Sequence, residues 1–65
     1  MQKKDAEKVV IAFEKRNGPT ISLSEAMGMT KVNTDGNEMY AFQKGDVTFL
    51  AWFNRGKVIV KTQAW

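Results

Sequence analysis

The spacing of hydrophobic positions changes at about residue 29. Before that point, apolar residues recur three and four positions apart, as on one face of a helix. After it, they alternate with polar residues or run continuously between turn formers, as in strands. The pattern therefore predicts an α+β domain with its helices first and its strands last.

An N-terminal helix is expected over about 5–17, because Ala6, Val9, Val10 and Phe13 share one face at helical spacing. Asp5 is the predicted N-cap. Gly18 is expected to end the helix in a left-handed conformation, followed by a proline that cannot continue the turn. Ile11 lies off the apolar face, so it either contacts something else or is simply exposed.

A second, short helix is expected over about 23–28, capped by Ser22 or Ser24 and ended by Gly28. The string LSEAMGMT, which follows the first helix and a Gly-Pro break, is similar to the second helix and turn of helix-turn-helix DNA-binding domains. That resemblance would imply a recognition helix next. The following string, KVNTDGNEMYAF, has no helical spacing and predicts strands instead.

The strands are expected to form a three- or four-stranded antiparallel β-meander over about 29–33, 38–43, 47–53 and 57–62. Asp35-Gly36 indicates a two-residue hairpin turn, in which both central residues need positive φ. Lys44-Gly45 and Asn54-Arg55-Gly56 mark the other two turns. The 65 residues are expected to form one small domain.

The strand VTFLAWF is largely apolar on both faces. Phe49 and Phe53 point to one side, and Leu50 and Trp52 to the other. Only one substantial helix is predicted, and the segment 23–29 is the one candidate to cover part of the second face. Trp52, Leu50 and Ile59 are therefore expected to leave an apolar patch on the order of 300 Å².

The register of the last two strands decides which face carries the basic residues. A four-residue loop puts Phe53 opposite Val58 and keeps the lysines away from Phe49. A three-residue loop with Gly56 in a bulge puts Phe53 opposite Lys57 and brings the lysines to the Phe49 side. Polar alternation in the last strand favours the first register, whereas the turn residues Asn-Arg-Gly favour the second.

The net charge of +3 is concentrated near the C-terminus. Basic and acidic side chains cancel within residues 1–46, whereas residues 47–65 carry three basic side chains and no acidic one, the basic residues being Arg55, Lys57 and Lys61. These cations either keep a small protein soluble or, beside exposed apolar residues in the last hairpin, form an electropositive contact surface.

Several chemistries are disfavoured by what the sequence lacks. Without histidine or cysteine, the commonest general base, the thiolate nucleophile and a structural zinc site are missing. The segment 31–42 has a glycine at its sixth position but Lys31 and Phe42 where a calcium loop needs acidic ligands. No stretch has the length and apolar character of a membrane span or a signal peptide. We therefore expect a cytoplasmic protein that is not an enzyme and has no metal, cofactor, small-molecule substrate or membrane attachment.

Two functions remain open. The first is nucleic-acid binding, DNA or RNA, through stacking on an aromatic ring and contacts from cations to phosphates. The second is a protein-binding regulator, such as an inhibitor or adaptor, whose partner is acidic, with homodimerisation as a special case. Either would use the C-terminal hairpin, and the residues predicted to bind the partner are Leu50, Trp52, Arg55, Lys57, Ile59 and Lys61.

Overall fold

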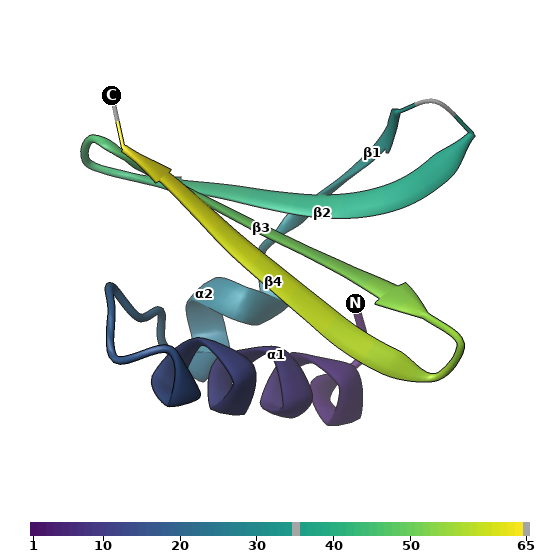
Figure 1. The fold of residues 1–65 in the computed structure, drawn as a ribbon, viewed down its shortest axis with the longest axis horizontal. Helices are drawn as coiled ribbons and strands as arrows, with labels where there is room; N and C mark the ends of the chain where they lie inside the picture. The colour runs from purple at the N-terminus through teal and green to yellow at the C-terminus, as the bar shows by residue number, and fades with distance from the viewer. Residues whose placement is uncertain (35, 65) are drawn as a thin grey trace.

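A computed structural model describes residues 1–34 and 36–64 of the chain (Figure 1). The strands follow one another across an antiparallel sheet in the order β1-β2-β3-β4. This confirms the predicted α+β fold, with four strands in the meander. In chain order the elements are α1 (Lys3–Lys15), α2 (Leu23–Met27), β1 (Thr30–Thr34), β2 (Asn37–Lys44), β3 (Val47–Asn54) and β4 (Lys57–Ala64).

Helix α1 begins and ends two residues before its predicted bounds. Its N-cap is Gln2, whose side chain makes no capping hydrogen bond, so the prediction of Asp5 as N-cap is wrong. Asp5 lies in the first turn, where a carboxylate suits the positive end of the helix dipole. Asn17, with a φ of 57°, takes the left-handed position after the helix, rather than Gly18 as predicted. Asparagine tolerates this conformation because its short polar side chain can bond to the local backbone.

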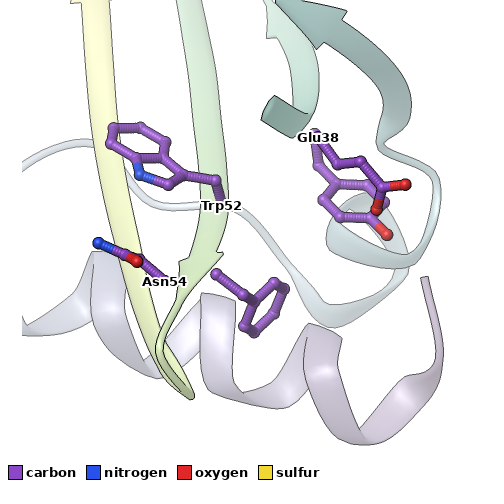
Figure 2. Close-up of a pocket in the computed structure, with 5 residues that line it drawn as sticks. Glu38, Trp52 and Asn54 are labelled. Carbon is purple, nitrogen blue, oxygen red and sulfur yellow. The ribbon is translucent and has the colours of Figure 1, made fainter. Parts of the chain in front are cut away.

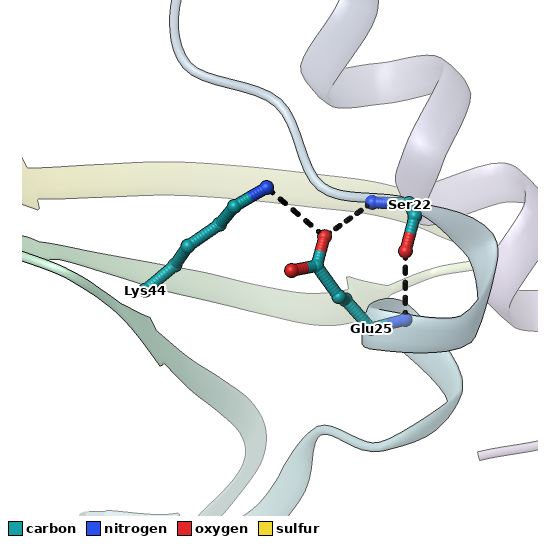
Figure 3. A network of polar contacts seen from close by, with 3 residues as sticks. All are labelled: Ser22, Glu25 and Lys44. Atoms are coloured by element: carbon teal, nitrogen blue, oxygen red, sulfur yellow. Dashed lines mark hydrogen bonds and ion pairs between the residues drawn. The ribbon is translucent and has the colours of Figure 1, made fainter.

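Helix α2 is held by a capping box, which selects Ser22 from the two predicted serines (Figure 3). The Ser22 N–H donates to Glu25 Oε1 at 2.7 Å, and the Glu25 N–H donates to Ser22 Oγ at 3.1 Å. Lys44 Nζ also donates to Glu25 Oε1, at 3.1 Å, and ties α2 to the end of β2. The hydrogen bond from the Ser22 backbone, followed by that from Lys44, lowers the pKa of the Glu25 carboxyl.

Gly28 ends α2 as predicted, and the chain then enters the sheet. Within the described part of the chain, the next element after α2 is β1, so the recognition helix implied by the helix-turn-helix resemblance does not follow there. Gly36, at a φ of 80°, has the positive φ expected of the first hairpin turn. Its predicted turn partner Asp35 lies outside the described residues.

Both helices lie on the same side of the sheet (Figure 1). The rings of Phe13 in α1 and Phe49 in β3 meet edge to face, with centroids 5.1 Å apart, and both are fully buried. This single core joins the two helices to the strands, and its buried members are Ala6, Val9, Phe13, Ile21, Ala26, Met29, Phe49, Ala51 and Val60.

The register of β3 and β4 is the first of the two predicted alternatives. Phe53 lies opposite Val58, and Arg55 and Gly56, with φ values of 52° and 77°, form the turn between the strands. The bulged alternative is therefore wrong. Phe53, however, is 37% exposed. It stands beside the turn, past the last residue of β3 that pairs with β2, and its ring contacts that of Tyr40 at 6.5 Å between centroids.

Candidate functional site

The face of the sheet that points away from the helices has no layer packed against it in residues 1–34 and 36–64 (Figure 1). The prediction that segment 23–29 covers part of this face is wrong. Ala26 and Met29 are buried in the same core as α1, on the opposite side. The apolar residues of α2 pack beside the apolar face of α1 on that side of the sheet. The two helices therefore form one layer, and the second side of the sheet stays uncovered.

The strand register shows which side chains lie on this uncovered side, because residues paired directly across two strands point to the same face. Val32 pairs with Met39, Ala41 with Leu50, and Trp52 with Ile59. We call this surface the open face. Its described side chains are Thr30, Val32, Met39, Ala41, Gln43, Thr48, Leu50, Trp52, Asn54, Lys57, Ile59, Lys61 and Gln63.

The centre of the open face is apolar and partly exposed. Val32 and Ile59 are each 36% exposed, and Leu50 and Trp52 are half-buried. With no layer over this face, the shielding comes from neighbouring side chains such as Ile59, which lies directly across from Trp52. A partner could therefore contact the indole without any part of the fold moving aside.

The structure brings most of the predicted partner-binding residues to this one surface. Leu50 and Trp52 on β3 and Lys57, Ile59 and Lys61 on β4 share the open face. The sixth, Arg55, lies in the turn at the end of these strands and not on the face itself.

Sequence reasoning missed the contributions of β1 and β2. Val32, Met39 and Ala41 extend the apolar centre of the open face across the sheet. The signal was the predicted two-residue turn Asp35-Gly36, because such a turn pairs position 34 with position 37, as observed, and thereby decides which face each residue of the hairpin occupies.

The charged side chains of the open face are all positive. Lys57 and Lys61 are exposed, no acidic side chain shares their face among the described residues, and neither lysine forms an ion pair there. On the other side of the sheet, Glu38 pairs with Lys31 at 3.0 Å and raises the pKa of that amine. The open face therefore presents unneutralised cations beside an apolar centre.

A hollow of about 280 Å³ opens next to Trp52, where β2 and β3 separate (Figure 2). Pairing between these strands runs from Lys44 and Val47 to Tyr40 and Ala51 and stops there. Trp52 and Asn54 project from β3 on one side of the gap, and Glu38 lies across it (Figure 2). Tyr40 and Phe53 complete the lining, so the hollow offers aromatic rings and hydrogen-bonding groups at the margin of the open face.

Comparison with known proteins identifies no relative: no protein-family model matches the chain, and no curated protein or solved structure is significantly similar to it. Neither helix in the described part of the chain has the length and apolar character needed to cross a membrane. The geometry and charge of the open face are therefore the features that indicate a function.

Proposed function

We propose that this is a small, non-enzymatic binding protein whose open face takes a single strand of nucleic acid. The observation that supports this most is the position of Trp52, a partly exposed indole on a face whose described charged side chains are all lysines. Stacking on such a ring contributes about 1–3 kcal/mol per base, and it tolerates any base sequence. A single strand fits better than a duplex because its bases are free to stack on a broad sheet surface.

In the proposed complex, one base stacks on the Trp52 indole, and Lys57 and Lys61 contact phosphates along β4. These lysines are four residues apart on one face, which sets their Cα atoms about 13 Å apart. Arg55 at the turn extends the cationic path past the end of the strands. Asn54 supplies an amide group that can bond to base edges.

The absence of histidine and cysteine from the sequence favours binding without catalysis. A cytoplasmic location is part of the proposal, because a chain without cysteine has no need of an oxidising compartment.

The test is a fluorescence anisotropy titration with labelled single-stranded DNA and RNA of mixed sequence over a range of salt concentrations. If Lys57, Lys61 and Arg55 each neutralise a phosphate, the logarithm of the affinity should fall against that of salt with a slope of about −2. Lys57→Glu combined with Lys61→Glu should abolish binding.

The matched control is Lys3→Glu combined with Lys4→Glu, which makes the same charge change at exposed positions of α1. No binding of either nucleic acid at low salt would refute the proposal. Equal loss of binding in the control would also refute it, since net charge alone would then explain the affinity.

The aliphatic side chains of the open face support a second candidate, a protein-binding regulator. Val32, Met39, Leu50 and Ile59 share the open face with the indole and add surface that cannot stack on bases. Protein interfaces, in contrast, have apolar centres and polar rims. The lysines would then select a partner with an acidic rim. For the special case of a homodimer, light scattering should give twice the monomer mass, and Trp52→Glu should restore the monomer.

A further inference from the structure

The outer edge of β4 is a second surface, separate from the open face. β4 is the last strand in the sheet order, and no strand of the described chain pairs with its outer edge. Asn54 and Lys57 flank the two-residue turn, so they form a hydrogen-bonded pair. Along an antiparallel ladder, hydrogen-bonded pairs alternate with non-hydrogen-bonded pairs, whose backbone groups point away from the partner strand. The backbone N–H and C=O groups of Val58, Val60 and Thr62 therefore point outward.

One of these outward carbonyls already accepts a hydrogen bond. Arg16 Nη1, from the residue that ends α1, donates to Val60 O at 2.7 Å. The guanidinium thus occupies the position that a backbone N–H of an added strand would take. Arg16 is exposed, so its side chain can swing away without disturbing the core.

A groove runs beside this edge, between β4 and α1, with a volume of about 380 Å³. Ile11, Ala12 and Val58 form its apolar part, and Ile11, which lies off the core face of the helix, is 50% exposed. Lys8 and Lys15 complete the lining, and no acidic side chain is part of it. The groove therefore combines apolar surface with positive charge along an unpaired strand.

Cations flank the edge on both sides of the sheet. Lys8 and Lys15 stand on the helix side, whereas Lys57 and Lys61 stand on the open face. Successive side chains of an added strand would alternate between these two sides. An acidic residue would therefore lie near a lysine whether it pointed to the helix side or to the open face.

We infer that the outer edge of β4 binds an acidic, extended peptide segment of another protein, which adds to the sheet as a fifth strand. Backbone hydrogen bonds to Val58, Val60 and Thr62 supply affinity in this mode, and alternate side chains supply specificity. Apolar side chains on the helix side would enter the groove at Ile11. This site does not depend on the proposed function of the open face.

The charges disfavour a second copy of this chain as the occupant. Pairing of two β4 edges would bring the lysines of both copies together, and like charges across a strand pair are destabilising. Nucleic acid is disfavoured because the groove is lined by aliphatic and not aromatic side chains, and its phosphates cannot donate to the outward carbonyls.

The probe is a fluorescent eight-residue peptide of alternating acidic residues and valines, which matches the length of β4. Its binding is measured by anisotropy. The control peptide has the same sequence with N-methylated valines, which keep the charge and the side chains but cannot donate backbone hydrogen bonds. The unmodified peptide should bind, and methylation should weaken its binding by roughly tenfold or more. Equal affinity of the two peptides, or binding of neither, would overturn the inference.

Matched variants locate the site. Thr62→Pro removes one outward N–H while leaving the inner ladder intact, and should weaken peptide binding, whereas Thr62→Val should not. Lys8→Glu should weaken binding by roughly tenfold, and Lys3→Glu, the same charge change outside the groove, should have much less effect. Circular dichroism checks that each variant folds.

Equal effects of Lys8→Glu and Lys3→Glu would overturn the inference, as would concentration-dependent dimer formation that excludes the peptide. Trp52→Ala separates this inference from the proposed function, because it should weaken nucleic-acid binding and leave peptide binding unchanged. Loss of peptide binding in Trp52→Ala would place the peptide on the open face and overturn the edge site.

Discussion

Both faces of the sheet carry apolar side chains, but the helices pack against only one of them. On the covered face, Phe49 and Val60 are buried beneath α1. On the open face, Trp52 and Ile59 lie on the same two strands and remain partly exposed. The composition of a strand therefore does not reveal whether a face is core or surface, since that depends on where the helices pack.

The two sides of the sheet also differ in how their charged side chains are paired. Around the covered side, acidic and basic side chains pair, as Glu25 does with Lys44 and Glu38 with Lys31. The charged side chains among the described residues of the open face are Lys57 and Lys61, and neither forms an ion pair there. The open face therefore carries positive charge without ion pairs, whereas part of the charge on the covered side is neutralised in these two pairs.

The largest expected effect is on the covered face. Phe49→Ala should lower the free energy of unfolding by about 3–5 kcal/mol, because it leaves a cavity against Phe13. Urea denaturation measures this loss. Phe53→Ala, on the same face but 37% exposed, should cost roughly 1 kcal/mol. Similar losses from the two variants would show that the core does not centre on Phe49.

On the open face, Trp52→Ala should act on binding more than on stability. The affinity for a single strand should fall by roughly tenfold or more, as expected for the loss of one stacked base. Stability should fall by only about 1 kcal/mol, since the indole is not enclosed. Titration and urea denaturation of the same variant give both values. A stability loss as large as that of Phe49→Ala would mean that Trp52 belongs to a core.

The lysines of the open face should affect binding through charge alone. Lys57→Gln with Lys61→Gln should make the salt slope shallower by about 1.4, because two phosphate contacts are lost. The free energy of unfolding should stay within about 0.5 kcal/mol of the original value. An unchanged salt slope would move the phosphate contacts to other residues.

The smallest expected effect concerns the attachment of α2 on the covered side. The pKa of Glu25 is lowered in the folded protein, so its contribution to stability is complete above the ordinary value of 4.5 and is lost as pH falls through the folded-state pKa. The stability difference between the protein and Glu25→Gln should therefore be constant near neutral pH and shrink in acid. A difference that does not change with pH would contradict the role of this carboxylate.

Much of the fold could be predicted from the sequence because local signals agreed with one another. Ser22 and Glu25 form the capping box that starts α2, and the turn glycines separate the strands. The end of α1 was less predictable, since Asn17 and Gly18 are both suited to the left-handed position and the sequence does not decide between them.

The candidate site was only partly predictable, because it depends on tertiary packing. Alternation in β4 placed Lys57, Ile59 and Lys61 on one face correctly. The side on which α2 packs has no local signal, since Ala26 and Met29 would suit either face of the sheet. The groove beside β4 likewise depends on how α1 sits against the strand, which spacing along the chain cannot reveal.

The accounts of stability and binding both require that the centre of the open face is accessible to solvent in the folded protein, whereas the core beneath the helices is not. Nuclear magnetic resonance with a soluble paramagnetic agent tests it directly, by comparing the broadening of methyl signals. Those of Leu50 and Ile59 should broaden strongly, and those of Val9 and Val60 should be protected. Equal protection of all four residues in the monomer would show instead that the chain itself covers the open face.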